Sequence, residues 1–409
     1  MSKSLFFFWV LVICSTSSAS ARVWTVETDG SGDFADLQSA SDAAASGDTI
    51  LVGEGRFGEP GWSECLGDDL FTIMAITQES IVILGEGDDR SIIGPETPWS
   101  EELPFRAGIT AVGFCGTANL IIKGIGFENL THAVHCEFGL ERENDEPTSF
   151  SIENCEFREN YVSLFLDAHV NNVSNCTNFS TLLGASFVES YLGAPLRENH
   201  FRNCQSDFTN INTRQIALGG EVLTVDDCDF SGGSPWNGTG ITTTTNRLEI
   251  RDSLIMGDRW GVIFRGRDIS ISGSQFFNLK KGVWLVEPDF FIEMESCVFS
   301  DIQVSSISYC PTTRGGVVRG CNLSRGAEFT VSHTPYKSSE DLAKSPNSEY
   351  YIDMTHNFWE TDDPDSIRTW IEDGADDDDW PYFILWKPFL ENQVEANAKS
   401  LGDVKALFR

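Results

Sequence analysis

Two apolar positions, five residues apart, recur in one short phrase after another along the middle of the chain. The second position of each phrase is occupied by Phe127, Phe157, Phe201, Phe230, Ile255, Phe276, Phe299 and Leu323. The first position is occupied by Ile122, Ile152, Leu196, Val225, Ile250, Ile271, Met294 and Val318. Most copies follow one another at intervals of about 21 to 30 residues, and a repeat of this length is the sequence sign of a solenoid.

A mostly small residue and a bend residue lie between the two apolar positions. The small position holds Ile125, Cys155, Asn199, Cys228, Ser253, Ser274, Cys297 and Cys321. The position before it holds Gly124, Asn154, Glu198, Asp227, Asp252, Gly273, Ser296 and Gly320. Apart from Glu198 and Ser296, these bend residues are types that tolerate a left-handed backbone. Each phrase is therefore predicted to be a short strand, a sharp bend and a second short strand.

A third strand follows in several copies, because apolar residues alternate seven and nine residues after the second apolar position. These pairs are Val134 and Cys136, Leu164 and Leu166, Val262 and Phe264, and Val283 and Leu285. Residues 170–183 resemble a further, irregular copy, with Cys176 at the small position. Several short strands per unit, no helical period and tolerated insertions predict an all-β fold, a parallel β-helix of about ten coils.

Both ends of such a rod need a cap, because an open coil exposes apolar side chains and strand edges. At the front, Asp33 is predicted to cap a helix with Phe34, Leu37 and Ala44 toward one side and Gly47 at its end. At the back, a second helix is predicted to begin at Asp365 and end at Gly374. Its apolar face comprises Ile367, Trp370 and Ile371.

The chain begins with a lysine, a short apolar run and a small-residue stretch that ends at Ala21, which is typical of a signal peptide over residues 1–21. We expect a secreted protein, extracellular or periplasmic, with no membrane span after cleavage. The β-helix domain is predicted over residues 22–391, with caps at about 22–60 and 352–391 and a tail at 392–409. A capped rod of this kind is expected to be a monomer.

Ten cysteines remain after the leader with Cys14 is removed. They show no pairwise spacing typical of zinc sites, so no metal site is predicted from them. Stacking in a tight inner corner predicts buried free thiols. A disulfide between Cys297 and Cys321, in adjacent coils, is the alternative.

The ends of the repeat region resemble a known superfamily. The segments "DGSGDF" and "SGDTILVGEG" at the front, and "THNFWETDDPDSI", "DGADDD" and "KPFL" at the back, resemble exported bacterial proteins of the pectin-lyase-like superfamily. The resemblance implies a right-handed parallel β-helix. It does not imply one activity, because the superfamily includes lyases, hydrolases, esterases, epimerases and non-catalytic adhesins.

The surface is strongly acidic, with 62 acidic against 28 basic residues and a formal net charge of −34. Such a surface repels nucleic acid, so no nucleic-acid partner is expected. Its aspartate runs could collect Ca²⁺, but they lack a fixed loop spacing, and solvated turns explain them better.

Basic side chains gather between residues 247 and 281 against this acidic background. By repeat phase, Arg259 and Lys280 are predicted to stack in neighbouring coils, near Arg265. The cluster suggests a subsite for an acidic sugar, and pairing of these cations with Asp258, Asp252 or a loop carboxylate is the alternative.

Aromatic residues add to this candidate site. Phe165, Ile263 and Trp284 are predicted to point outward, and a ring such as Trp284 could hold a sugar. Arg214 and Trp236 lie in insertions that could border a groove.

No catalytic residues are assigned. Asp226 and Asp227 fit the repeat rather than an acid/base pair, and Asp167 and His169 lack a partner arginine motif. The sequence therefore predicts a protein that binds or processes polysaccharide, as a polysaccharide lyase or glycoside hydrolase if it is an enzyme. The alternative is a non-catalytic surface or scaffold protein.

Overall fold

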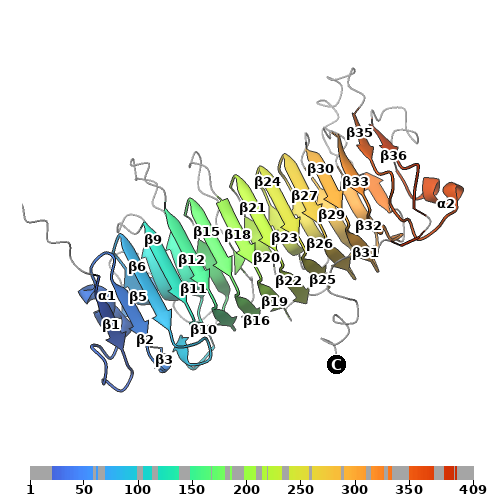
Figure 1. Cartoon of the computed structure of the whole chain (residues 1–409). Helices are drawn as coiled ribbons and strands as arrows, with labels where there is room; N and C mark the ends of the chain where they lie inside the picture. The colour runs from blue at the N-terminus through green and yellow to red at the C-terminus, as the bar shows by residue number, and fades with distance from the viewer. Residues whose placement is uncertain are drawn as a thin grey trace, which may run out of the picture.

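The computed structural model describes residues 21–58, 61–62, 70–98, 105–112, 118–137, 148–166, 168–179, 185–186, 198–208, 214–218, 220–232, 239–257, 260–286, 290–309, 315–326, 330–333, 350–372, 382–390 and 392–393. These residues form a rod of stacked coils, with α1 at one end and α2 at the other (Figure 1). Each coil contributes a strand to a first sheet, a second sheet and a third face in turn.

The first sheet has 14 strands. In spatial order they are β1 (Val23–Val26), β2 (Thr49–Val52), β6 (Ser80–Gly85), β9 (Asn119–Lys123), β12 (Ser149–Glu153), β15 (Val170–Ser174), β18 (Glu198–Arg202), β21 (Val222–Asp226), β24 (Arg247–Arg251), β27 (Asp268–Ser272), β30 (Phe291–Glu295), β33 (Gly315–Arg319), β35 (Tyr350–Asp353) and β36 (Tyr382–Leu385). The second sheet has 10 strands among the described residues, and single-residue bridges through Asn322, Phe358 and Leu390 continue it, so the rod has more coils than the ten or so that the repeat predicts. The strands are β3 (Gly55–Phe57), β7 (Ser91–Ile93), β10 (Gly126–Glu128), β13 (Glu156–Arg158), β16 (Thr177–Phe179), β19 (Gln205–Phe208), β22 (Asp229–Gly232), β25 (Leu254–Met256), β28 (Gln275–Phe277) and β31 (Val298–Ser300).

We use "third face" for two further sheets that follow one another along the rod. The 5-stranded sheet contains β14 (Val162–Leu166), β11 (His132–Glu137), β8 (Phe105–Val112), β5 (Leu70–Ile76) and β4 (Gly61–Trp62). The 7-stranded sheet contains β17 (Ala185–Ser186), β20 (Arg214–Leu218), β23 (Thr239–Thr243), β26 (Trp260–Phe264), β29 (Lys281–Leu285), β32 (Ser305–Tyr309) and β34 (Val331–His333). Strand pairs are parallel except β4 with β5.

The bend between the first and second sheets uses a left-handed residue in successive coils. The φ angle is positive at Gly124, Asn154, Asn175, Asn203, Asp227, Asp252, Gly273, Ser296 and Gly320. The next residue turns inward and bonds the carbonyl two positions back, as Cys228 Sγ does to Asp226 O at 3.3 Å and Ser253 Oγ does to Arg251 O at 2.7 Å. The position therefore favours a small side chain that can donate.

The seven described cysteines are buried free thiols, as predicted. This set includes Cys297 and Cys321, so the disulfide alternative is wrong. Cys176 takes its expected place in the corner, where its Sγ contacts Ser174 O at 3.3 Å. Cys65, Cys115 and Cys310 lie outside the described residues.

Aromatic rings stack inside the rod, as the repeat predicts. The rings of Phe127 and Phe157 are 5.3 Å apart and nearly parallel, and those of Phe276 and Phe299 are 4.7 Å apart. Burial of one such side chain stabilises the fold by about 1.5–3 kcal/mol. The predicted inward residues of the third strand, such as Val134 and Leu285, are also buried.

One repeat was aligned wrongly from the sequence. Phe201 pairs with Val173 and Val225 in the first sheet, and it does not belong to the phenylalanine column of the second sheet. Cys204, rather than Asn199, is the corner residue of that coil, and Asn203, rather than Glu198, is its bend residue. The five-residue spacing from Leu196 to Phe201 imitates the repeat, whereas the hydrogen-bonded register decides the phase.

Both predicted caps contain a helix, but each N-cap was misassigned. Helix α1 (Leu37–Ala43) is capped by Asp36, whose side chain accepts from Ser39 N, while Asp33 bonds Thr25 instead. Helix α2 (Pro364–Thr369) is capped by Asp363 rather than Asp365. Pro364 is its first helical residue, so the capping carboxylate belongs to the residue directly before Pro364.

The helix ends also differ from the prediction. Ala44 is the C-cap of α1, and Gly47 lies in the following turn with φ +92°. Gly374 lies outside the described residues. Ile367, Trp370 and Ile371 form the predicted buried face of the back cap. Neither described helix is long and apolar enough to cross a bilayer.

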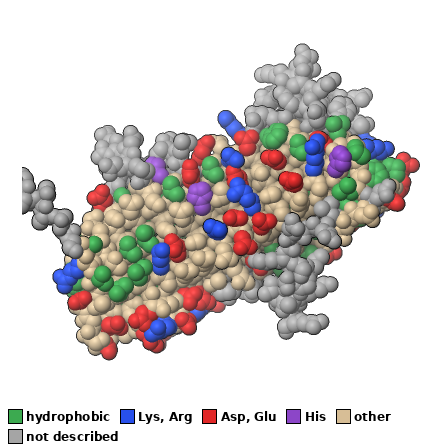
Figure 2. All heavy atoms as spheres, in the orientation of Figure 1, with side chains coloured by type: hydrophobic (Ala, Val, Ile, Leu, Met, Phe, Trp, Pro, Cys, Tyr) green, Lys and Arg blue, Asp and Glu red, His purple; other side chains and the backbone are tan. Residues whose placement is uncertain are grey.

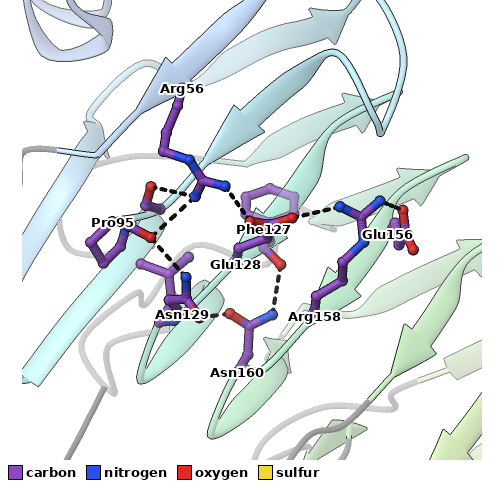
Figure 3. A network of polar contacts seen from close by, with 10 residues as sticks. Arg56, Pro95, Phe127, Glu128, Asn129, Glu156, Arg158 and Asn160 are labelled. Atoms are coloured by element: carbon purple, nitrogen blue, oxygen red, sulfur yellow. Dashed lines mark hydrogen bonds and ion pairs between the residues drawn. The ribbon is translucent and has the colours of Figure 1, made fainter. Parts of the chain in front are cut away.

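Charged side chains join three coils across the second sheet (Figure 3). Glu128 accepts from Arg56 and from Arg158, with an Arg158 Nη1 to Glu128 Oε1 distance of 2.5 Å. Arg158 also bonds Glu156, and Arg56 donates to the carbonyls of Gly94 and Pro95 at 3.1 Å. Two guanidinium groups and two carboxylates thus neutralise one another, which makes this network a structural clamp.

Candidate functional site

On the third face, β26 departs from strict alternation of inward and outward side chains. Within β26, Gly261 and Val262 both face the interior, because a Cβ on Gly261 would lie 2.8 Å from a Leu279 side-chain carbon and Val262 is fully buried. The first and fourth residues of β26, Trp260 and Ile263, therefore lie on the same side. Side chains at the same two positions touch in three other strands: His132 with His135, Lys281 with Trp284, and the fully buried Ser305 with Ser308.

In β26 and β29 the second strand position is glycine, because phenylalanine rings and a neighbouring backbone carbonyl fill the space beneath it. A Cβ on Gly282 would lie 2.6 Å from the Phe299 ring and 2.6 Å from Ser306 O. The phenylalanine column thus determines which residues of these strands point outward.

Charge differs sharply between the faces. The outward positions of the first sheet carry carboxylates such as Glu153, Asp226 and Glu249, and acidic and basic side chains are interspersed on the visible side of the rod (Figure 2). Glu137 is the one carboxylate in the described strands of the third face. The described strands of this face are therefore almost free of acidic groups, in a molecule with a net charge of −34.

Two tryptophans form the centre of the candidate site. The rings of Trp260 and Trp284, on adjacent strands, are 5.4 Å apart at an angle of 48°. The Lys281 ammonium lies 4.9 Å from the centroid of the Trp284 ring, close enough for a cation–π interaction. All three side chains are partly exposed. The next strand places Ser308 beside Trp284, and its hydroxyl bonds Ser332 Oγ at 2.7 Å.

Of the predicted site residues, Trp284 belongs to this centre. Arg214 occupies the first position of β20, paired with Thr239, which in turn pairs with Trp260. Lys280 directly precedes the first strand position and is partly buried, while Arg265 directly follows β26 and is exposed. Arg259 and Trp236 lie outside the described residues, so their predicted stacking and loop positions stay predictions.

The basic stretch of the sequence does not form one patch. Arg247 and Arg251 lie on the first sheet, where both bind Glu249, and the Arg247 Nη2 to Glu249 Oε1 distance is 2.5 Å. Lys281 lies on the third face. Residues that are close in sequence are separated because one coil wraps around the rod.

Sequence reasoning missed Trp260, His132 and His135, and it placed Lys281 in the basic cluster without recognising its contact with Trp284. The sequence does place aromatic, imidazole or cationic residues at the first and fourth positions of these strands. A model in which inward and outward residues strictly alternate, however, assigns the first position to the interior. Of the residues predicted to point outward, Phe165 and Trp284 are partly exposed, whereas Ile263 is only 7% exposed.

The two histidines are nearly buried rings that pack beside Phe165. His132 and His135 are 8% and 9% exposed, and burial together with the neighbouring His135 lowers the pKa of His132 to about 3. The His135 ring stacks on Phe165 at 4.4 Å with an interplanar angle of 3°.

The residues considered as acid/base candidates lie in contacts that serve the fold. Asp227 has the left-handed φ of the bend, and Asp226 lies 3.9 Å from Arg202. His169 Nδ1 contacts Thr148 Oγ1 at 2.9 Å, and Asp167 lies outside the described residues. Within the described part of the chain, no three histidine, cysteine or acidic side chains are grouped to hold a metal ion.

Comparison with known proteins supports the architecture. A family model described as a right-handed β-helix region matches residues 183–334. The chain is a right-handed parallel β-helix. The match supports a β-helix family of the pectin-lyase-like kind, which includes carbohydrate-active proteins and others. Neither the curated proteins nor the solved structures gave a match.

Proposed function

We propose that this β-helix protein binds carbohydrate through Trp260, Lys281 and Trp284 on its third face. Partly exposed aromatic rings can pack against the apolar face of a sugar ring, and they gain binding energy from area as well as geometry. The observation that carries the proposal is the pair of tryptophans, whose described strands are nearly free of carboxylates in a very acidic molecule. A solvated structural surface would be expected to share the acidic character of the first sheet.

The test is binding to a panel of neutral and acidic polysaccharides, with and without Ca²⁺, followed by product analysis. Trp284→Ala and Trp260→Ala should each weaken binding about tenfold or more, as loss of an aromatic anchor does. Phe291→Ala is the matched control, because Phe291 is 38% exposed but lies on the first sheet. Absence of binding across the panel would reject the proposal and favour the scaffold hypothesis. Release of shortened saccharides would show that the protein also cleaves its ligand, as a lyase or a hydrolase.

The acidic-sugar hypothesis has its own test. Arg259→Glu with Lys280→Glu should abolish binding of acidic glycans and leave binding of neutral glycans unchanged. Equal affinity of the wild type and the double variant for acidic glycans would remove these two residues from the site.

We also propose that residues 1–21 direct export and are removed. N-terminal sequencing of the protein from the culture medium or periplasm should begin at Arg22. A chain that keeps Met1 inside the cell would contradict this proposal.

A further inference from the structure

Three polar side chains on the outer side of the first sheet contact one another in a chain. In β18, Asn199 and Phe201 are buried, so the alternating residues Glu198 and His200 both point outward. The parallel register places Thr224 of β21 directly beside His200, and His200 Nδ1 lies 2.7 Å from Thr224 Oγ1. On the other side of the imidazole ring, His200 Nε2 lies 3.4 Å from Glu198 Oε2. A hydroxyl, an imidazole and a carboxylate are thus linked in that order.

The chemistry of the three groups sets the direction of their contacts. A carboxylate only accepts hydrogen bonds, so the ring proton of neutral His200 belongs on Nε2, which faces Glu198. Nδ1 then carries a lone pair and accepts the hydrogen bond that the Thr224 hydroxyl donates. A hydroxyl that donates to a neutral imidazole, which is itself oriented by a carboxylate, is the arrangement that activates a side-chain oxygen for nucleophilic attack.

A substrate can reach these groups from solvent. The exposed fraction of the side chain is 33% for His200 and 53% for Glu198, and Thr224 is partly exposed. Val222 points to the same side of β21, two residues before Thr224, and is also partly exposed. An acyl group bonded to Thr224 would therefore have an apolar neighbour.

A cation lies beside this chain of contacts. Arg202 is the next outward residue of β18 after His200, and the register places it opposite Asp226. Its Nε is 3.9 Å from Asp226 Oδ2 and its side chain is 77% exposed, so the guanidinium is held only loosely. Such a group can turn toward a carbonyl oxygen at Thr224 and stabilise the negative charge that develops on it.

We infer that this site hydrolyses esters of short acyl groups, with Thr224 as the nucleophile, His200 as the general base and Glu198 as a positioning residue. In the first step, Thr224 Oγ1 bonds to the acyl carbon while its proton passes to His200 Nδ1. The ester C–O bond then breaks, and the leaving alcohol takes that proton from Nδ1. The inference goes beyond the proposed function, because the two sites lie on different faces of the rod.

Water completes the reaction. A water molecule gives a proton to His200 Nδ1 while its oxygen bonds to the acyl carbon. The bond between the acyl carbon and Thr224 Oγ1 breaks, Oγ1 takes the proton back from Nδ1, and a carboxylic acid is released. The side chains return to their starting state, so the reaction consumes only the ester and water.

The experiment measures the release of p-nitrophenolate from p-nitrophenyl acetate by the purified full chain. Thr224→Val removes the hydroxyl at nearly constant volume and should lower kcat/KM about hundredfold, as should His200→Gln. Thr224→Ser keeps a hydroxyl and should retain activity within about tenfold of the wild type. Glu198→Gln should lower kcat about tenfold and leave KM unchanged, because Glu198 orients the base and does not bind the substrate.

His356→Gln is the matched control. His356 Nδ1 also contacts a threonine hydroxyl, Thr355 Oγ1, at 3.0 Å. That hydroxyl donates to Asp353 Oδ1 at 2.7 Å, so its proton is not directed at the imidazole. The variant should hydrolyse the ester as fast as the wild type. Urea denaturation of each variant separates a loss of activity from a loss of folding.

A covalent trap tests the wild type directly. Acid quenching during turnover, followed by mass mapping of peptides, should find an acetyl group on Thr224. Three results would each overturn the inference: no hydrolysis by the wild type, unchanged hydrolysis by Thr224→Val, or an acetyl group on histidine alone, which is the mark of simple imidazole catalysis at a surface. None of them bears on carbohydrate binding by the third face, which the tryptophan variants test separately.

Discussion

At the residue scale, one small side chain organises each bend between the first and second sheets. A left-handed residue turns the chain, and the next side chain donates to the carbonyl two positions back, whether it is Cys155, Cys228 or Ser253. Backbone N–H groups also reach across coils to these side chains, as Cys228 N does to Ser253 Oγ at 3.1 Å. Cysteine and serine are thus interchangeable here because both are small donors.

The thiols of this corner should be unreactive in the folded protein. Burial raises the pKa of the Cys176, Cys228 and Cys297 thiols well above the ordinary value, and the thiolate is the reactive form. A hydrogen bond with Cys228 lowers the pKa of the Cys204 thiol, so burial alone protects Cys204 from a reagent. In a mature chain with Cys65, Cys115 and Cys310 changed to serine, Ellman's reagent should modify no thiol natively. After denaturation in guanidinium it should modify all seven described cysteines. Rapid native reaction of the thiols would contradict the buried corner.

At the element scale, the order of side chains along one strand decides what each face displays. The phenylalanine column requires Gly261 and Gly282 beneath the third face, and this places Trp260 and Lys281 outside. Across the second sheet, the clamp around Glu128 joins β3, β10 and β13 (Figure 3).

Loss of the Glu128 charge should weaken this clamp. Glu128→Gln should lower the free energy of unfolding by about 1–3 kcal/mol, because two arginines lose their charged acceptor. Glu54→Gln is the control, since the Glu54 side chain is 69% exposed beside Arg90 and should change stability by less than about 0.5 kcal/mol. Urea denaturation measures the free energy of unfolding of both variants. Equal losses of stability in the two variants would show that the clamp does not stabilise the fold.

The same clamp should make stability depend on pH. Burial raises the pKa of Glu128, but hydrogen bonds and charge from Arg56 and Arg158 outweigh burial and hold it below its ordinary value of 4.5. The stabilisation is therefore complete above pH 4.5 and is lost as the pH falls through the lowered pKa of the folded state. The difference between wild type and Glu128→Gln in urea should narrow over that acidic range. A difference that stays constant down to pH 2, or widens as the pH falls, would refute this linkage.

At the scale of the whole molecule, the rod depends on closed ends. Helix α1 packs against β5, β1 and β2, with Leu37 and Ala40 buried at the front end. Trp370 and Ile371 close the far end, where Val331 forms a bridge to Ile371. These contacts cover the apolar side chains and strand edges that an unfinished coil would expose.

Disruption of the front cap should cause unfolding from that end and self-association. Leu37→Glu places a carboxylate in the cap and should cost more than about 3 kcal/mol. Ala43→Glu is the matched control on the exposed side of α1 and should leave stability nearly unchanged. Size-exclusion chromatography with light scattering should show oligomers only for Leu37→Glu. A monomeric, stable Leu37→Glu protein would show that the cap is dispensable.

The sequence by itself determined the repeat, the bend residues, the free thiols of the corner and the existence of both caps. These follow from local requirements, because a left-handed bend, a small corner and a buried ring each select residue types that recur from coil to coil, although Asn178 and Ser206 interrupt the column of rings. The tertiary structure alone decided the phase of the coil at Phe201, the N-caps at Asp36 and Asp363, and which residues share the third face. These features depend on strand register and on how much room the interior leaves for a side chain at each backbone position. Two successive inward residues in β26, rather than strict alternation, are what bring Trp260 and Trp284 together.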